Sequence, residues 1–431
     1  MFRVCARYPA ARLLLILPAL ALANCGGNNT GEVLTVPNSV VVADLTGNGF
    51  LDVAVAEAQI DQTGLSQKPG VLSVIMNTAA SPGNFQAPVD YVASSDPPSA
   101  LAVGDLSGTG SHDFVVASNA AGSLAVFMET SPTSGTYGAA TTIPVGGQPN
   151  DVQIADINGD GLPDLIVADN LGNVTYLLQN PAKPGTFLPG VSLPISNPAN
   201  VAEDEPTRAI KVAVGDLNGD GLPDLAVTSF DDGGDNGEVF IFFQDPMHPG
   251  TFLPAPTVIP APGEPSGIVI KDVNQDGLPD IEVALQGLGN NSTTVEAEAN
   301  EGAMIILQNT GAAGTFAAPA IYPAAYGVLR IAVADLNDDG LPDIAMCSLY
   351  PQGEGTIVTL MQDPANPGQF LSANTYVGQG QPASIVIGDL NNDGLPDLVT
   401  ADATSVVWYT NNTSSPGNFG LVGQIGLPPI D

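Results

Sequence analysis

The chain has 431 residues and a formal net charge of −36 at pH 7, because 45 Asp and Glu residues stand against only nine Lys and Arg residues. A field of this sign repels nucleic acid and anionic lipid headgroups and attracts cations. The composition is nevertheless 44% hydrophobic, which excludes a disordered acidic chain. The acids must therefore gather in discrete places while the apolar residues build a core.

The first 24 residues have the order of a secretory signal, in which Arg3, Arg7 and Arg12 precede an apolar run too short to span a membrane. The run ends at Leu22-Ala23-Asn24-Cys25, which resembles the lipobox of bacterial lipoproteins, although Asn24 stands where that pattern prefers Gly, Ala or Ser. The resemblance implies lipidation of Cys25. The alternative is ordinary signal-peptidase cleavage after Ala21-Leu22-Ala23.

These features predict a signal peptide over residues 1–24, a flexible tether over 25–31, and an exported protein. It would be an outer-membrane or cell-surface lipoprotein, or alternatively a freely secreted chain. Removal of the three signal arginines and no acids takes the charge from −36 to −39. Cys5 leaves with the signal, so no intrachain disulfide is expected, and Cys347 lies in an apolar run that predicts burial.

A nine-residue loop then recurs seven times, at intervals of 51 to 63 residues. Five copies have the complete form DxNxDGLPD and two are degenerate. A second marker, a Gly two residues before an aromatic, recurs seven times in phase with the first. The loops start at Asp44, Asp105, Asp156, Asp216, Asp272, Asp335 and Asp389, and the aromatics are Phe85, Tyr137, Phe187, Phe252, Phe316, Phe370 and Phe419.

Each repeat predicts four short strands. In the fourth repeat Ile210 to Val214 enters the Asp loop, Leu225 to Thr228 leaves it, Glu238 to Phe243 follows, and the Gly-x-Phe segment opens the last strand. Helical periodicity is missing. Seven such units predict an all-β fold, one seven-bladed β-propeller over residues 32–431. Separate sandwiches are the alternative, but the units are too small to bury a core alone. The strand order predicts closure without a strand exchanged between the end blades.

The DxNxDGLPD loops, with a downstream Gly-Thr-Phe and Ala-Pro as at Phe316 to Pro319, resemble the FG-GAP/VCBS repeats of bacterial surface proteins and of the integrin α-subunit propeller. The resemblance covers essentially the whole mature chain. It implies a propeller fold and calcium, and it leaves function open, because such propellers serve as adhesins, lectins, hydrolases and lyases.

The loops themselves also predict calcium. Calcium takes six to eight oxygen ligands, which side chains at positions 1, 3, 5 and 9 and the carbonyl of position 7 supply, while Gly at position 6 permits the turn. Five sites are expected, with ligands Asp156, Asn158, Asp160, Leu162 and Asp164; Asp216, Asn218, Asp220, Leu222 and Asp224; Asp272, Asn274, Asp276, Leu278 and Asp280; Asp335, Asn337, Asp339, Leu341 and Asp343; and Asp389, Asn391, Asp393, Leu395 and Asp397.

The first loop adds a sixth possible site through Asp44, Asn48 and Asp52, with Thr46 at position 3; the second keeps only Asp105 and Asp113 and is the weakest candidate. Magnesium fits less well because it prefers octahedral geometry with retained waters, and zinc would need His or Cys. An Asx-turn hairpin without metal is the alternative reading. The expected role of the ions is structural.

Strand alternation puts the Asp loops on one face, and all the variable length falls on the other, before the third strands and between blades 3 and 4. The inserts are Gln59 to Pro69, Asp231 to Gly237, Gln286 to Gly302, Tyr350 to Gly355 and Asn197 to Arg208. Neutral insertion is the alternative explanation. Tyr350 and Arg208 are the candidate contact residues.

No catalytic residues are predicted, because the only histidines, His112 and His248, lie far apart in sequence and are expected at the surface. The predicted function is a monomeric, calcium-binding adhesion module for a protein or polysaccharide, with no nucleic-acid partner and no membrane contact beyond a lipid anchor. The alternatives are a carbohydrate-active lyase or hydrolase, which would need carboxylates, Arg and aromatics converging on the central channel, and a purely structural envelope protein.

Overall fold

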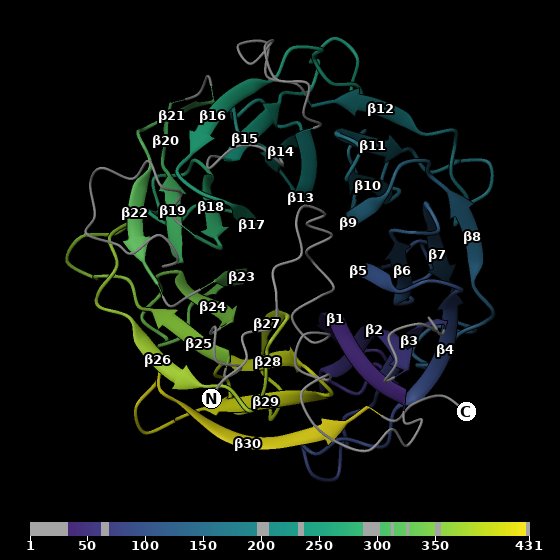
Figure 1. Ribbon diagram of the computed structural model, residues 1–431, viewed down its shortest axis with the longest axis vertical. Coiled ribbons are helices and arrows are strands. Elements are labelled where there is room, and N and C mark those ends of the chain that lie inside the picture. The colour runs from purple at the N-terminus through teal and green to yellow at the C-terminus, as the bar shows by residue number, and fades with distance from the viewer. Residues whose placement is uncertain are drawn as a thin grey trace, which may run out of the picture.

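Seven antiparallel sheets form a closed ring in the computed structural model of the chain (Figure 1). The structure describes residues 33–61, 69–195, 207–231, 237–287, 302–311, 314–324, 327–349 and 355–427. These residues form strands, turns and loops; among them there is no helix, and hence none that could span a membrane. The predicted signal peptide and tether lie outside the described residues. The seven-bladed propeller predicted from the repeats is confirmed.

Each blade has four strands. The innermost are β1 (Val33–Ala43), β5 (Pro98–Gly104), β9 (Pro149–Ala155), β13 (Thr207–Gly215), β17 (Pro265–Lys271), β23 (Val328–Ala334) and β27 (Ser384–Gly388). The second are β2 (Asp52–Asp61), β6 (Asp113–Ser118), β10 (Asp164–Asp169), β14 (Asp224–Asp231), β18 (Asp280–Leu285), β24 (Asp343–Leu349) and β28 (Asp397–Asp402). The third are β3 (Gly70–Ile75), β7 (Ser123–Phe127), β11 (Asn173–Leu177), β15 (Gly237–Phe242), β19 (Ala303–Leu307), β25 (Gly355–Leu360) and β29 (Ser405–Asn411). The outermost are β4 (Val89–Ser94), β8 (Thr141–Pro144), β12 (Val191–Pro194), β16 (Thr257–Ala261), β22 (Ala320–Pro323), β26 (Asn374–Val377) and β30 (Phe419–Gly426).

Burial follows position in the blade. Strands β6, β10, β18 and β28 are buried at every residue, because both of their faces pack on neighbouring blades. Their sequences begin with Asp and are otherwise mainly apolar. The outermost strands β8, β12 and β26 are mostly exposed. Hydrophobic clusters lie between the blades: one, for example, joins Ile166 and Val174 of blade 3 to Val212 and Phe240 of blade 4. Neighbouring blades therefore share their cores.

The ring closes without an exchanged strand, as predicted. Blade 1 consists of β1 to β4 and blade 7 of β27 to β30, each paired in chain order. The two are joined by side chains: Asn77 Nδ2 donates to the Leu390 carbonyl at 2.8 Å, and the ring of Phe85 meets the edge of Trp408 with centroids 4.9 Å apart. Packing and hydrogen bonds thus hold the two ends of the domain together.

One strand assignment was wrong. The Gly-x-aromatic segment does not open the fourth strand in blades 1 to 6; it forms a small hairpin before that strand, closed by a bridge such as Gln179 to Phe187. In blade 5 the hairpin strands are β20 (Asn309–Gly311) and β21 (Thr315–Phe316), and only in blade 7 does the aromatic, Phe419, begin the outer strand. The aromatic is held by an edge contact across the seam to the preceding blade, as between Phe252 and Tyr176 at 5.3 Å, which local sequence does not reveal.

Candidate functional site

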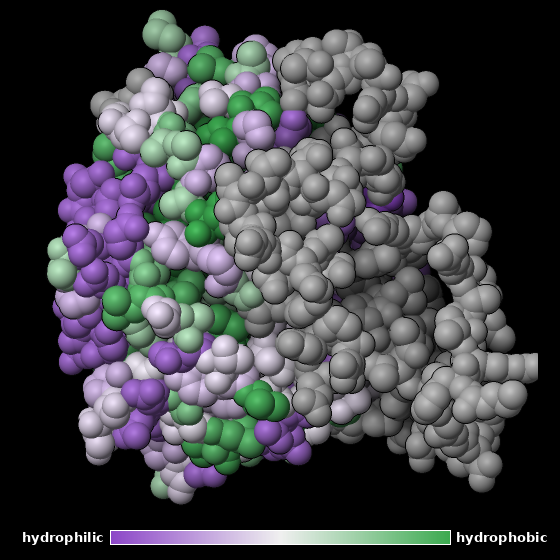
Figure 2. All heavy atoms as spheres, turned by 60° about the vertical axis from the view of Figure 1, so that its left-hand side comes forward, coloured by the Kyte–Doolittle hydropathy of each residue, from purple (hydrophilic) through white to green (hydrophobic). Residues whose placement is uncertain are grey.

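All seven Asp loops connect the first and second strands of a blade, so they lie on one face of the disc, as predicted. Figure 2 shows hydrophilic residues gathered along the left-hand edge of the molecule in that view. The loops turn through positive φ at position 6, where Gly221 has a φ of 87°. At position 4 blades 5, 6 and 7 carry Gln275, Asp338 and Asn392 in the same left-handed region, at 58° to 60°.

The side chains of positions 1, 3 and 5 form a network on the loop backbone. In the fourth loop the N–H of Asp220 is shared by Asp216 Oδ1 at 3.1 Å and Asn218 Oδ1 at 2.9 Å, so these two oxygens converge. Asp216 Oδ2 accepts the N–H of Gly221 at 2.8 Å, and Asp220 Oδ1 that of Leu222 at 2.9 Å. Loops 5, 6 and 7 repeat the shared N–H, at Asp276, Asp339 and Asp393.

Position 9 has a different environment, because its carboxylate is fully buried. Asp224 Oδ2 accepts the N–H of Leu217 at 3.0 Å, and Oδ1 accepts that of Gln244, the second residue after β15, at 2.8 Å. Burial raises the pKa of Asp224 to about 6 despite these hydrogen bonds, and the nearby charges of Asp220 and Asp216 raise it further. The same pattern recurs at Asp52, Asp164, Asp280, Asp343 and Asp397.

The donor set of the complete loops fits calcium in chemistry. It consists of oxygens only, and each carboxylate oxygen that accepts one N–H keeps a second lone pair. Positions 1 and 3 converge, and the charge of position 9 is within electrostatic range of positions 1 and 5. Within the described part of the chain no three Asp, Glu, His or Cys side chains surround one point. An ion here would therefore complete its shell with the Asn oxygen, loop carbonyls and water.

The two degenerate loops differ from each other. In loop 1, Asp44 accepts the N–H groups of Asn48 and Gly49, and Asp52 is buried like the other position-9 residues. In loop 2 three hydroxyls fill the loop: Ser107 Oγ lies 3.2 Å from Asp105 Oδ1, 2.5 Å from Thr109 Oγ1 and 2.8 Å from Ser111 Oγ. Burial opposes ionisation of Asp105, but hydrogen bonds from backbone and hydroxyls outweigh it and lower its pKa. Hydroxyl hydrogen bonds thus stabilise the ionised Asp105 carboxylate in this loop.

Each Asp loop also contacts the Gly-x-aromatic hairpin of the next blade. A Cβ on Gly250 of blade 4 would lie 2.7 Å from Asn158 Cβ in loop 3, and one on Gly368 of blade 6 would lie 2.8 Å from Asn274 Cβ in loop 5. The backbones approach so closely that only Gly fits, and both glycines have positive φ. The two repeated markers are therefore two halves of one contact between neighbouring blades.

One residue in each blade, which was not predicted from the sequence, connects the Asp loop to the hairpin. It is Asn, Gln or Glu, two places after the third strand or at the end of that strand in blade 7. Gln244 Nε2 donates to the position-8 carbonyl of Pro223 at 2.6 Å, and its Oε1 accepts the N–H of Gly250 at 2.8 Å. Where the residue is Asn, it also reaches the preceding blade: Asn411 Nδ2 donates to Leu336 O at 2.7 Å. The available signal was an Asn, Gln or Glu six residues before the Gly of each Gly-x-aromatic, or five residues before it in blade 5.

On the opposite face, the spacing between second and third strands varies strongly. β28 ends at Asp402 and β29 begins at Ser405, whereas β18 ends at Leu285 and β19 begins at Ala303. Most of each predicted insert, and Tyr350, lie outside the described residues. Arg208 lies in β13, opposite Phe230 in β14.

The histidines lie apart from one another. His248 is exposed and its Nδ1 lies 2.8 Å from Asp245 Oδ2. His112 was expected at the surface but is half-buried, because it occupies position 8 of loop 2, next to the buried Asp113; its backbone N–H donates to Glu129 Oε2 at 3.0 Å. Cys347 is buried as predicted, and burial raises the pKa of its thiol to about 12.

A buried acid outside the loops has a defined protonation state. Ser73 Oγ lies 2.6 Å from both Glu57 Oε1 and Asp90 Oδ1, and one hydroxyl proton cannot serve two carboxylates. Glu57 is fully buried, which raises its pKa to about 8, with the charge of Asp90 adding to the effect. Glu57 is therefore protonated at neutral pH and donates to Ser73, which donates to Asp90.

Replacement of Glu57 by Gln is expected to change how stability depends on pH. The folded pKa of about 8 exceeds the ordinary 4.5, so Glu57 stabilises the fold fully below pH 4.5, and this contribution is lost as pH rises to 8. The loss is about 1.4 kcal/mol per pH unit in that window. Urea unfolding at pH 5, 6 and 7 should give a shallower fall for Glu57→Gln than for the wild type. Identical slopes would show that Glu57 is ionised in the fold.

Comparison with known proteins agrees with the repeats. Residues 105–167, 156–227 and 216–283 each match the family model described as an FG-GAP-like repeat, and each match starts at the first Asp of a loop. No curated protein sequence matches the chain. Among solved structures, the chain is similar to a protein from Lactobacillus plantarum (TM-score 0.49, 12% identity, 93% of this chain and 97% of that one). It is also similar to the Dos1 propeller (TM-score 0.48, 11% identity, 91% and 88%). The chain is therefore a seven-bladed β-propeller that contains FG-GAP-like repeats, matched over residues 105–283.

Proposed function

We propose that this protein is an exported, calcium-stabilised binding module without catalytic activity, which uses the face opposite the Asp loops to hold a protein or polysaccharide. The observation that carries the calcium part is the convergence of position-1 and position-3 oxygens on one N–H in four complete loops. The ion would neutralise the position-1 and position-5 carboxylates and fix the hairpin that starts each blade.

The division between the two faces supports the binding part. The Asp-loop face is occupied by contacts that recur at every seam, in which hairpin glycines approach the preceding loop. The opposite face carries the connections whose length varies between blades, from Asp402–Ser405 to Leu285–Ala303. Variable loops on a rigid scaffold are where binding residues concentrate. Export, the Cys25 lipid anchor and a monomeric state belong to the same proposal and rest on the sequence.

Calcium titration into the chelated mature protein, followed by calorimetry, tests the calcium part. Uptake of one ion per complete loop is expected, five in all, with a rise in melting temperature, because each site stabilises the fold by about 2.7 kcal/mol at 100 times its Kd. Asp216→Asn should remove one ion. Asp105→Asn, in the hydroxyl-filled second loop, is the matched control and should leave the count unchanged. An unchanged melt on calcium addition would refute the proposal.

The binding part needs its own measurement. A variant in which residues 288–301 are replaced by a short Gly-Ser turn should keep the calcium stoichiometry and the melting temperature while it loses retention on immobilised surface polysaccharide. In the control variant every loop keeps its length, and Asp245 on the Asp-loop face is replaced by Asn. Equal retention of both variants and the wild type would remove the assignment of the binding face.

A further inference from the structure

The inner strands place seven equivalent residues around the central axis. In six blades the first strand has a register shift, and the residue after it pairs with a small residue of the second strand, such as Ala168 or Ala284. Ser384 of blade 7 pairs with the equivalent Ala401. We call this set the axial ring: Ser39, Ala100, Asp151, Lys211, Gly267, Arg330 and Ser384. Because the residue types differ from blade to blade, the seams between them differ in charge.

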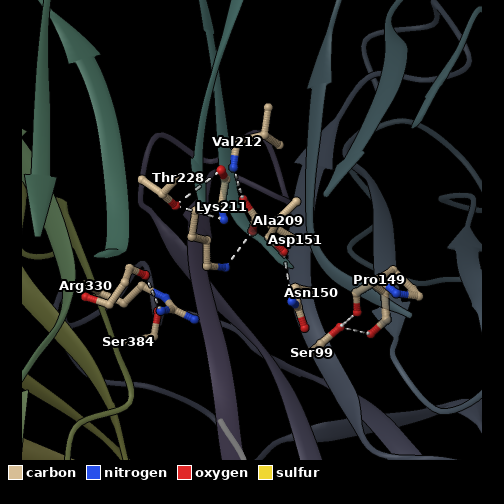
Figure 3. Close-up of polar contacts among 12 residues, drawn as sticks. Ser99, Pro149, Asn150, Asp151, Ala209, Lys211, Val212, Thr228, Arg330 and Ser384 are labelled. Atoms are coloured by element: carbon tan, nitrogen blue, oxygen red, sulfur yellow. Dashed lines mark hydrogen bonds and ion pairs between the residues drawn. The ribbon is translucent and has the colours of Figure 1, made fainter. Parts of the chain in front are cut away.

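At the seam between blades 3 and 4 the ring holds an ion pair (Figure 3). Lys211 Nζ lies 2.6 Å from Asp151 Oδ1, and both side chains are nearly buried, with exposed fractions of 11% and 7%. Asp151 Oδ2 also accepts the N–H of Val212 at 3.1 Å. The carboxylate of the preceding blade thus satisfies both the cation and the backbone of the following one.

At the seam between blades 5 and 6 the same positions hold a cation without its acid. Arg330 takes the place of Lys211, and Gly267 takes the place of Asp151. A Cβ on Gly267 would lie 3.4 Å from Ala284 Cβ, Arg330 Cα and Ile331 Cγ2, at the short limit of ordinary contact, and the φ of Gly267 lies outside the left-handed region. The position therefore accepts a Cβ, where the equivalent position of the other seam carries a carboxylate.

The guanidinium is only partly satisfied. Arg330 Nη1 donates to the carbonyls of Ser266 at 3.0 Å and Leu329 at 2.8 Å. Its Nε and Nη2 have no protein acceptor among the residues that the structure describes, and Arg330 is mostly buried but keeps some exposed surface. A guanidinium edge with parallel N–H donors is the arrangement that binds a carboxylate through two hydrogen bonds.

The local charge favours a monoanion. Lys211 and Arg330 carry two positive charges and Asp151 one negative, a surplus of one in a protein of net charge −36. Burial lowers the pKa of Lys211 to about 8, and the positive charge of Arg330 contributes to this lowering. The two cations are therefore close enough to repel each other. A carboxylate balances this surplus, whereas a dianion would be repelled by Asp151.

We propose that the axial seam between blades 5 and 6 binds the carboxylate of an external ligand, which pairs with the free edge of Arg330 and takes the place that Asp151 fills in the equivalent seam. The site is independent of the calcium loops and of the variable loops. A carboxylate introduced at position 267 of the protein should therefore pair with Arg330 and exclude the carboxylate of an external ligand.

The test uses the mature protein and acetate, with chloride at the same ionic strength as the reference. Acetate binding is followed by saturation-transfer NMR of its methyl group and by thermal melts. Arg330→Gln, which keeps amide donors for the two carbonyls and loses the charge, should weaken acetate binding roughly tenfold. Gly267→Asp should abolish it while melting in chloride at or above the wild-type temperature. Lys183→Gln removes an exposed cation elsewhere and should bind like the wild type.

The outcomes separate cleanly. Loss of binding in both Arg330→Gln and Gly267→Asp, with binding retained in Lys183→Gln, supports the proposal. If Arg330→Gln does not fold, Gly267→Asp alone decides, because it keeps both cations. Saturable acetate binding that survives in Gly267→Asp, no binding by the wild type, or binding of sulfate at least as tight as that of acetate would each overturn it.

Discussion

Replacement of Asp224 by Ala is expected to destabilise the propeller by about 2 to 6 kcal/mol, even when calcium is chelated. The Asp224 carboxylate is fully buried and accepts two backbone N–H groups, from Leu217 at 3.0 Å and Gln244 at 2.8 Å. Ala leaves both donors buried and unpaired, and each costs about 1 to 3 kcal/mol. Urea unfolding in a chelating buffer, followed by far-ultraviolet circular dichroism, measures the loss.

The matched control lies in the same loop. Asp220 is exposed and accepts only the N–H of Leu222 from the next turn of the loop, which water can replace. In chelating buffer Asp220→Ala should therefore cost at most about 0.5 kcal/mol, whereas in calcium both variants should lose stability. A loss for Asp224→Ala in chelator as small as that for Asp220→Ala would show that the hydrogen bonds of Asp224 do not stabilise the fold.

The difference between Asp224 and Asp220 could not be predicted from the sequence, although the loops themselves could. The repeat of Asp at positions 1, 5 and 9 located the loops correctly, but a carboxylate that holds a cation and one that caps backbone amides are the same residue in the sequence. Position 9 differs only because the following strand is buried on both faces, which draws Asp224 into the core with it. That burial depends on the neighbouring blades.

The fold was predictable because two markers recur in phase over the whole chain. The function of the second marker was not, since Phe252 meets Tyr176 from another blade, and a contact across 76 residues leaves no local pattern. The axial ring was invisible for a related reason. Its members each lie five residues before the first Asp of a loop, but their residue types share no pattern, and the sequence does not show which of them meet, as Lys211 and Asp151 do.

Replacement of Trp408 by Ala is expected to cost about 3 to 5 kcal/mol, because it empties the seam where the ring closes. Trp408 is 7% exposed and packs with Val53, Val399 and Leu427 in the cluster that joins blade 7 to blade 1, with its ring against Phe85. At the other six seams the chain itself links adjacent blades. Here side chains alone hold the ends, so the same loss of packing also frees blade 1 from blade 7.

Two variants separate packing from closure. Trp408→Phe keeps a ring against Phe85 and removes the buried indole N–H, which has no hydrogen-bond partner among the described residues, so it should cost less than about 1.5 kcal/mol. Phe370→Ala breaks the equivalent aromatic pair with Tyr322 at the seam between blades 5 and 6, where the chain is continuous. Melts followed by circular dichroism give the stabilities, and limited proteolysis reports opening at the ends. Trp408→Ala should be cleaved first within blades 1 and 7, and Phe370→Ala should not. Equal cleavage patterns would mean that the covalent links between blades contribute nothing to local stability, and that all seven seams open as one unit.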